Sequence, residues 1–371
     1  MATKIVVVTG SNAGLGYHCV QSLANSASVN TIVMACRNTT EANKAANVIA
    51  AASSIGFKRD NIVVLPEACD LSDLKSVRTY SESLLKWLAG RKITALINNA
   101  GIGGSPVHSK NAAGHEKTFA TNHLGHFLLS LLILPSISER IVNVSSEVHD
   151  PKTGTGAPDP EIGYPSSREE YNTRMLAGER INGESNLVSG QRRYSRSKLC
   201  NIFFTNELAF RLSGDIPKNL DESTIAATLL LPHRSSCTLS SAKRIRCVAY
   251  NPGLMLDSKF VTSSMGSLLG WVVYLLSPVI RLTSLGSLMR STPVSGERLC
   301  RLALGEIASD GSAETVTAAY YSDESRIPSS TFSLSKVAAT KFQAELWDCS
   351  VEWAGVTEKD LIATGFKGVK K

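Results

Sequence analysis

The 371-residue chain is predicted to form an α/β fold around a doubly wound parallel sheet. Two observations carry this prediction. Short apolar runs rich in β-branched residues alternate with helical stretches through the first half of the chain, and a glycine-rich turn links the first run to the first helix. Continuous apolar strands that alternate with helices indicate a parallel sheet covered on both faces. Hydrophobic residues make up 43% of the chain and charged residues 19%, which is typical of a globular protein with a sizeable core.

The predicted elements follow from composition and spacing. The stretch 74–88, for example, carries apolar residues at helical spacing on one side and polar residues on the other. The predicted strands are 5–8, 31–35, 62–66, 95–97, 141–144, 245–250 and 317–321, and the predicted helices are 17–27, 41–53, 74–88, 116–133, 194–212 and a C-terminal stretch within 332–353.

Two segments interrupt the alternation and are predicted to be insertions. Residues 151–190 contain four prolines and many polar residues, with helical character around 168–177, and residues 214–243 are also irregular. No internal repeat and no clean linker is evident. The sequence therefore predicts a single domain over residues 1–371 with two insertions.

Residues 260–280 contain no charged side chain. Their apolar core, 268–276, is too short and too interrupted to predict a transmembrane helix. The surrounding region, 255–295, is interpreted as a lid over an apolar pocket or as a peripheral membrane contact, with a buried core helix as the alternative. The first predicted strand begins at Lys4, so no signal or transit peptide is expected in this sequence.

The net charge is +7, and much of the excess lies between Arg192 and Arg246. No nucleic-acid motif accompanies it, so we expect no nucleic-acid partner and interpret the basic stretch as facing a phosphorylated cofactor or a membrane surface. The eight cysteines include no Cys-x-x-Cys pair and are expected to be buried, reduced thiols of an intracellular protein. His123 and His126 lack zinc-site spacing, so no metal is expected.

The glycine-rich turn is the strongest local motif. It follows a strand and opens a helix, the context in which glycines allow close approach of a diphosphate to the free N–H groups of a helix N-terminus. This predicts a Rossmann-type dinucleotide site, and the expected cofactor-binding residues of the turn are Gly10, Ser11, Asn12, Gly14, Leu15 and Gly16.

Polar residues follow three further strands at the edge where parallel sheets bind ligands. Arg37 and Asn38 end the second strand, where an arginine in place of an acidic residue favours the 2′-phosphate of NADP(H). The next two strands end in further candidates. These candidate cofactor-binding residues are Asp70 and Leu71 after the third strand, and Asn99, Ala100 and Gly101 after the fourth.

Tyr194 and Lys198 are four residues apart, so they lie on the same side of a helix, one turn from each other. Such a pair occurs in many helices and does not by itself indicate catalysis. A lysine ammonium beside a phenol would favour the phenolate, which is otherwise scarce at neutral pH.

The complete set of motifs resembles the short-chain dehydrogenase/reductase family. The motifs, in the order of that family, are Thr9-Gly-x-x-x-Gly-x-Gly16, Asn98-Asn-Ala-Gly101, Asn122, Ser145-Ser146, Tyr194-x-x-x-Lys198 and Pro252-Gly253. The resemblance implies that Tyr194 is the acid/base and that Lys198 binds the nicotinamide ribose and lowers the pKa of the tyrosine. It also implies that Asn122 holds a water in the proton relay, that Pro252 and Gly253 approach the nicotinamide, and that Ser146 hydrogen-bonds the substrate oxygen, with Ser145 as the alternative.

Within that family, the motifs 35–38, 121–127 and 197–201 resemble the branch of retinol dehydrogenases and light-dependent protochlorophyllide reductases. Cys200 and the long insertion resemble the latter, whereas Leu254 stands where those enzymes have a cysteine after the Pro-Gly pair. The resemblance also implies that helices used for dimer contacts are present, which makes a homodimer one expectation.

The sequence therefore predicts an NADP(H)-dependent oxidoreductase for a bulky apolar carbonyl or alcohol of retinoid, steroid or isoprenoid type. The expected location is cytoplasmic or peripheral to a membrane. One alternative is light-dependent protochlorophyllide reduction, which would imply a plastid. The alternative of another class is an NADP(H)-binding regulator or scaffold without turnover.

Overall fold

The computed structural model describes residues 3–150, 165, 167–181, 183–213, 245–255, 290–307, 318–322, 325–327 and 336–364. Its strands form one eight-stranded sheet in the order β3-β2-β1-β4-β5-β6-β7-β8. All neighbours pair in parallel except β8, which is antiparallel to β7. The chain order reverses between β1 and β4, as in a doubly wound sheet, and this confirms the predicted fold class. The strands are β1 Ile5–Thr9, β2 Thr31–Ala35, β3 Ile62–Val63, β4 Ile93–Asn98, β5 Ile137–Val144, β6 Arg246–Asn251, β7 Ala318–Ser322 and β8 Ser325–Ile327.

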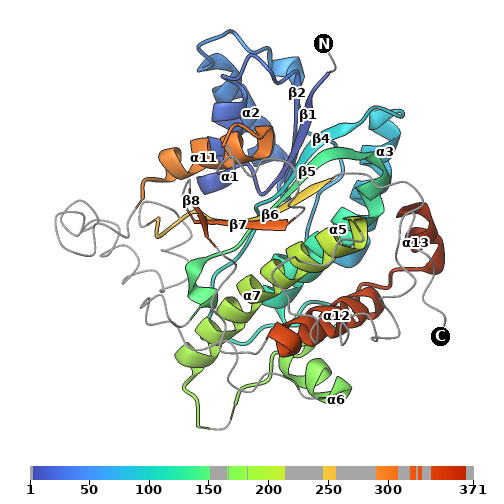
Figure 1. Ribbon diagram of the computed structural model, residues 1–371. Helices are drawn as coiled ribbons and strands as arrows, with labels where there is room; N and C mark the ends of the chain where they lie inside the picture. Colours follow the sequence, from blue (N-terminus) through green and yellow to red (C-terminus); the bar gives the residue numbers. More distant parts are fainter. Residues whose placement is uncertain are drawn as a thin grey trace, which may run out of the picture.

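Helices cover both faces of the sheet (Figure 1). Alternate residues of β1 point to opposite faces, so that Val7 belongs to one hydrophobic cluster, while Val6 and Val8 belong to the other. The cluster of Val6 and Val8 includes side chains of α1 Gly14–Leu23, α2 Thr39–Ala51 and α11 Thr292–Leu304. The cluster of Val7 includes side chains of α3 Leu74–Leu88, α5 Gly125–Ile133, α7 Asn186–Ser213, α12 Lys336–Trp353 and α13 Glu358–Thr364.

The predicted helix 116–133 is present but is not a uniform α-helix. It consists of α4 Lys117–Phe119, a π-helical turn η2 Ala120–Leu124, and α5. The N–H of Gly125 bonds the carbonyl of Ala120, five residues earlier, which is the defining step of a π-helix. The widened turn contains Asn122, and such turns frequently mark functional sites.

Several predicted boundaries were wrong. Helix α1 begins at Gly14 rather than at residue 17, so the glycine-rich turn is shorter than expected. Helix α7 has 28 residues and begins at Asn186, which takes the last residues of the predicted insertion 151–190 into the helix. Strand β3 has only two residues. Helix α11 begins at Thr292, inside the region 255–295 that had been interpreted as a lid or membrane contact.

The described part of the first insertion packs against the C-terminal helix. It contains α6 Arg168–Glu170 and a second π-helical stretch η6 Tyr171–Leu176, which confirms the helical character predicted around 168–177. The Tyr171 hydroxyl donates to Glu345 at 3.2 Å, and the Trp353 indole N–H donates to Asn172 at 2.9 Å. This part of the insertion therefore stabilises α12.

Helix α12 itself lies against α7 (Figure 1), and α13 contacts α5. The predicted insertion 214–243 and the apolar segment 260–280 lie outside the described residues. Within the described part of the chain, no helix combines the length and the apolar character needed to cross a bilayer.

Candidate active site

The glycine-rich turn leaves β1 through a close contact with the end of β4. Gly10 has a φ of +60°, and a Cβ there would lie 2.8 Å from Ala100. In the first turn of α1, a Cβ on Gly16 would lie 2.6 Å from the Gly10 carbonyl and 2.5 Å from the Asn99 side chain. Only glycine fits these two positions without displacing the backbone.

The outer surface of the same turn is open. Gly14 has a φ of +57°, and a Cβ there would have no atom within 4 Å. No side chain caps the N-terminus of α1, and its first turn carries no acidic residue. The first N–H groups of α1 therefore remain available to an anion, which is the arrangement that suits a diphosphate.

Two of the predicted cofactor-binding side chains of the turn point inward instead. The Ser11 hydroxyl donates to the Val8 carbonyl at 3.1 Å and lies 3.4 Å from the Cys36 sulfur. Leu15 is buried in the core, and Asn12 is half-buried. Ser11 and Leu15 would therefore contact a ligand through their main-chain atoms.

A hydroxyl of β1 fixes the end of β4. Thr9 Oγ1 accepts hydrogen bonds from the N–H groups of Asn99 at 2.9 Å and Ala100 at 3.0 Å. The Asn99 side chain donates in return to the Thr9 carbonyl at 2.8 Å and to the Gly10 carbonyl at 3.2 Å. The turn and the Asn98–Gly101 stretch therefore form one hydrogen-bonded unit, although the sequence separates them by about 90 residues.

The residues after β2 and β3 have mixed roles. Arg37 is exposed at the end of β2. Asn38 accepts a hydrogen bond from the Glu41 N–H at 3.0 Å and caps α2. Asp70 accepts from the N–H and hydroxyl of Ser72 at 2.9 and 2.7 Å. Leu71 is buried against Gly125 of α5. Of this group, Arg37 is the side chain most open to a ligand.

Tyr194, Lys198 and Ser146 meet at the carboxyl ends of β5 and β6. The Lys198 ammonium lies 5.6 Å from the centre of the Tyr194 ring and donates to the Val144 carbonyl at 3.1 Å. A Cβ on Gly101 would lie 3.6 Å from that ammonium. The Tyr194 hydroxyl is hydrogen-bonded to the Ser146 side chain. The predicted pair thus lies beside the predicted serine and the Asn98–Gly101 stretch.

The geometry separates the two adjacent serines. Ser145 is buried, its hydroxyl donates to the Lys198 carbonyl at 2.8 Å, and its N–H donates to the Tyr250 carbonyl at 2.7 Å. Ser146 is half-buried and faces the Tyr194 hydroxyl. Ser145 therefore holds α7 against the sheet, while Ser146 is the serine with access to the phenol.

Burial dominates the electrostatics of this pair. It raises the pKa of the Tyr194 phenol, and the hydrogen bond with Ser146 lowers that pKa only in part. Burial also lowers the pKa of Lys198 to about 8. Lys198 does not contribute to this shift, and the expectation that it lowers the tyrosine pKa stays a prediction. The phenol is protonated at neutral pH and is ready to donate a proton.

Asn122 connects the end of β4 to α7. Its side-chain oxygen accepts from the Ile102 N–H at 2.8 Å, and its side-chain nitrogen donates to the Ile102 carbonyl at 3.0 Å and to the Ser197 hydroxyl at 2.9 Å. Ser197 in turn donates to the Tyr194 carbonyl at 2.7 Å. The side-chain amide of Asn122 is thus held on both sides, and the main-chain carbonyl of Asn122 is contacted by His126.

Pro252 and Gly253 follow β6 and complete the edge of the site. Gly253 has a φ of +78°, and its N–H donates to Asn251 at 3.1 Å. The Pro252 carbonyl accepts from Ser295 of α11 at 2.8 Å. Arg290 packs on Gly253, where a Cβ would lie 3.0 Å from its side chain. This contact with Arg290 was not predicted from the sequence, because the two residues are far apart in the chain.

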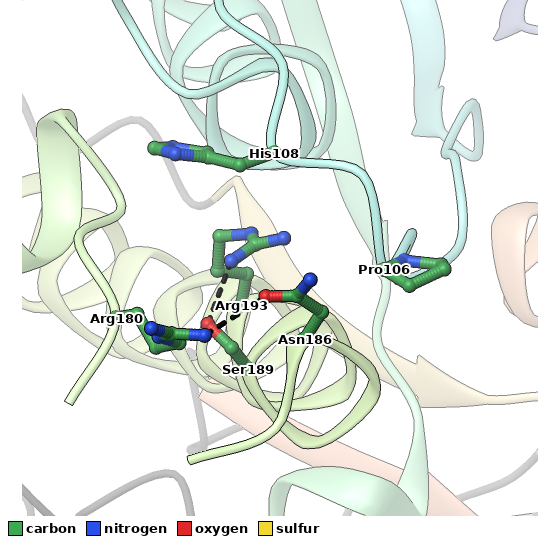
Figure 2. Close-up of a pocket in the computed structure, with 6 residues that line it drawn as sticks. All are labelled: Pro106, His108, Arg180, Asn186, Ser189 and Arg193. Carbon is green, nitrogen blue, oxygen red and sulfur yellow. Dashed lines mark hydrogen bonds between the residues drawn. The ribbon is translucent and has the colours of Figure 1, made fainter. Parts of the chain in front are cut away.

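A cavity of about 270 Å³ lies near the start of α7 (Figure 2), but it is not this site. Arg193 in its lining is held by Ser189 at 2.8 Å and by an ion pair with Glu116 at 3.5 Å. None of the predicted site residues lines this cavity. The lining residues are Pro106, His108, Arg180, Asn186, Ser189 and Arg193.

The basic stretch after Arg192 is not a surface patch where the structure describes it. The four arginines of α7 are buried, and three of them form ion pairs: Arg192 with Glu184, Arg193 with Glu116 and Arg211 with Glu207. The interpretation that this stretch as a whole faces a cofactor or membrane was therefore wrong for α7. The seven described cysteines are buried and unpaired. Among the described residues, no three side chains of metal-ligand type gather.

The sequence also matches known proteins. Residues 4–156 match the family model described as short chain dehydrogenase. Retinol dehydrogenase 12 of Homo sapiens is 35% identical over 221 residues, which cover 57% of this chain and 57% of that protein. The WW domain-containing oxidoreductase of Gallus gallus is 30% identical over 270 residues, covering 67% of this chain and 58% of that protein. The chain thus spans little more than half the length of the curated relatives it matches.

Solved structures match over more of the chain and support the fold alone. A putative uncharacterized protein from Mycobacterium paratuberculosis aligns with a TM-score of 0.55 and 23% identity over 95% of this chain and 94% of that one. A 3-ketoacyl-(acyl-carrier-protein) reductase from Brucella melitensis, solved with NADH, aligns with a TM-score of 0.50 and 19% identity over 86% and 96%.

Together, the family model and the relatives support a place for this chain in the short-chain dehydrogenase/reductase family. Relatives named retinol dehydrogenase are among the proteins that the chain matches, and this confirms the resemblance predicted from the motifs.

Proposed function

We propose that this chain is an NADP(H)-dependent oxidoreductase that reduces a bulky apolar carbonyl compound of retinoid type. The observation that carries the proposal is the meeting of Tyr194, Ser146 and Lys198 beside the uncapped N-terminus of α1, at the carboxyl edge of the sheet. Retinoid substrates are proposed because the relatives include proteins named retinol dehydrogenase.

The residues present fit a dinucleotide cofactor. The open surface at Gly14 and the free N–H groups of α1 would hold its diphosphate, and Lys198 and Gly253 would flank its nicotinamide end. NADP(H) is favoured over NAD(H) because the exposed Arg37 ends β2, where an acidic residue would suit a ribose diol. The cofactor, when bound, supplies the hydride.

The proposed role of the protein is to orient the substrate oxygen and to deliver a proton. Ser146 donates a hydrogen bond to that oxygen, and Tyr194 donates the proton. Burial raises the pKa of the Tyr194 phenol, so this group is protonated at neutral pH and can donate the proton that reduction requires. Asn122 holds the end of β4 and α7 in register through Ile102 and Ser197.

The test is oxidation of NADPH and of NADH by the full chain with all-trans-retinal in darkness, with a second arm using protochlorophyllide under illumination. The proposal predicts turnover of retinal in the dark, with NADPH preferred over NADH. A product that forms from protochlorophyllide only in light would contradict it. Tight NADPH binding without turnover of retinal or of related apolar aldehydes and ketones would favour a regulator or scaffold instead.

A further inference from the structure

His126 joins the two halves of the candidate site through both of its ring nitrogens. The side chain is 2% exposed. Its Nε2 lies 2.9 Å from Thr9 Oγ1 of β1, and its Nδ1 lies 3.0 Å from the main-chain carbonyl of Asn122. No other motif residue bridges the glycine-rich turn and the π-helical turn in this way among the described residues.

The hydrogen atoms of this bridge can be assigned from its partners. A carbonyl oxygen only accepts, so His126 Nδ1 must carry a hydrogen to bond Asn122. Thr9 Oγ1 already accepts from the N–H groups of Asn99 and Ala100, which fill its two lone pairs. Its own hydrogen is therefore directed to His126 Nε2 at 2.9 Å, and the Ile97 carbonyl at 3.3 Å is the weaker acceptor. The imidazole is neutral, with the hydrogen on Nδ1.

We propose that His126 is a positioning residue for the reaction. Its neutral imidazole holds the main-chain carbonyl of Asn122 at a fixed distance from the hydroxyl of Thr9. This fixes the position of the glycine-rich turn and the end of β4 relative to Asn122, which is linked to Tyr194 through Ser197. This inference rests on the proposed function, but it concerns a residue to which the family resemblance assigned no role.

Burial supports the neutral form. It lowers the pKa of His126 to about 4; the bond to the Asn122 carbonyl raises that pKa, and the Lys198 charge lowers it further. The ring therefore stays neutral across the physiological range, and the hydrogen-bond assignment does not change with pH there.

A neighbouring histidine offers a matched control. His123 lies three residues earlier in the same helical stretch and is also buried. Its Nε2 lies 3.1 Å from the Ser350 hydroxyl of α12, and its ring packs against Phe119 and Phe127. Burial lowers its pKa to about 3. The two histidines thus share burial and protonation state but contact different partners.

The first test requires no turnover. In the His123→Phe background, with ¹⁵N-labelled histidine, NMR should show two buried rings with the hydrogen on Nδ1: His149, whose Nδ1 contacts the Ser146 carbonyl, and His126, which should have an accepting Nε2 and stay unchanged between about pH 5.5 and 8.5. The His126→Phe variant should lack the His126 signal. A hydrogen on Nε2 of His126, or a His126 ring that titrates within this range, would overturn the proposal.

The second test compares His126→Phe with His123→Phe. We expect His126→Phe to lower kcat with NADPH and retinal by about 10- to 100-fold, because small displacements in a catalytic site carry costs of this size. The solvent deuterium isotope effect on kcat should rise as proton delivery becomes limiting. The Kd for NADPH should rise by about fivefold, the effect of one lost hydrogen bond. His123→Phe should leave all three values near those of wild type, even where both variants lose thermal stability.

His126→Asn is the conservative variant, because its amide can still donate toward the Asn122 carbonyl. It should recover part of kcat and lower the isotope effect, and it also serves where His126→Phe does not fold. Equal kcat, isotope effect and NADPH Kd in the two phenylalanine variants would overturn the proposal. That outcome differs from failure of the proposed function, which would appear as wild-type turnover by Tyr194→Phe or as no turnover by wild type. The NMR and NADPH binding results decide the role of His126 in either case.

Discussion

The helical stretch 117–133 has two buried sides that are built in different ways. Toward the sheet edge lies a polar seam, formed by hydroxyl, amide and imidazole groups. Toward α7 and α12 lies an aromatic seam. The polar seam consists of Thr9, Asn98, Asn99, Asn122, His126, Asn143 and Ser197, and the aromatic seam of Phe119, His123, Phe127, Phe204, Trp347 and Trp353.

The two seams differ in how strictly their contacts fix the positions of the groups. Hydrogen bonds in the polar seam fix positions to within tenths of an ångström, since each group has a partner with defined geometry, such as Asn98 to Asn143 at 2.8 Å. Ring contacts in the aromatic seam, such as Phe127 to Trp347 at 5.0 Å, stabilise by burying area and tolerate small shifts. We infer that the polar seam serves the reaction and the aromatic seam serves stability.

The largest expected effect concerns the aromatic seam. Trp347→Ala should lower the free energy of unfolding by about 3–5 kcal/mol, because it empties a buried site between Phe127, Phe204 and the Arg211 guanidinium. Denaturant unfolding measures this loss, and kcat per folded molecule should not change. Trp87→Ala, at a half-exposed tryptophan of α3, is the control and should cost much less. A loss of kcat in the folded fraction of Trp347→Ala would mean that the seams are not separate.

The adjacent residues Ser145 and Ser146 allow the same comparison between stability and catalysis at neighbouring positions. Ser146→Ala should lower kcat by about 100-fold at unchanged stability, because it removes a donor to the substrate oxygen and a partner of Tyr194. Ser145→Ala should instead lower the free energy of unfolding by about 0.5–1.5 kcal/mol, because a buried hydrogen bond to the Lys198 carbonyl of α7 is lost. Steady-state rates and denaturant titrations of both variants decide this, and the opposite pattern would reassign the serine.

The cofactor preference can be tested at Arg37. Arg37→Ala should raise the KM for NADPH by about tenfold and leave the KM for NADH unchanged, because a charge-assisted contact to the 2′-phosphate is lost. NADH serves as the internal control. Equal changes in the KM values for NADPH and NADH would show that Arg37 does not contact the 2′-phosphate.

The smallest expected effect is a pH dependence. Burial lowers the pKa of Lys198 to about 8, so its charge, and with it kcat/KM for retinal reduction, should fall as the pH rises through about 8. Stability should change with the opposite sign. Because the unfolded lysine keeps its proton up to its ordinary pKa of 10.5, the unfolded state binds more protons between about pH 8 and 10.5, and stability rises with pH there. Lys198→Arg should abolish the fall in rate near pH 8, whatever its absolute activity.

Sequence patterns predicted the fold closely where short-range chemistry decides it. Strand Thr31–Ala35 and helix Leu74–Leu88 match their predicted bounds, because apolar runs and amphipathic spacing are local signals. The start of α7 at Asn186 was missed, because its polar first turns resemble the preceding insertion. Helix α11 was also missed, although Pro293 near its start and Gly305 after its end are recognisable helix signals.

Some features of the candidate site were likewise predicted from the sequence, and others were not. Motifs predicted that Tyr194, Lys198 and Ser146 meet, and the structure brings them together, while their roles remain predictions. The bridge from Thr9 through His126 depends on a contact between residues 117 positions apart, which no local pattern reports. Burial likewise raises the pKa of Tyr194, and the sequence gives no measure of burial at that position.

The most direct test of the account is the rate of dark, NADPH-dependent retinal reduction by Tyr194→Phe beside wild type at neutral pH. If the protonated phenol of Tyr194 is the proton donor, the variant should lose about 100-fold or more in kcat, the typical contribution of a general acid, with unchanged NADPH affinity and unchanged stability. A variant that reduces retinal at the wild-type rate would contradict the account.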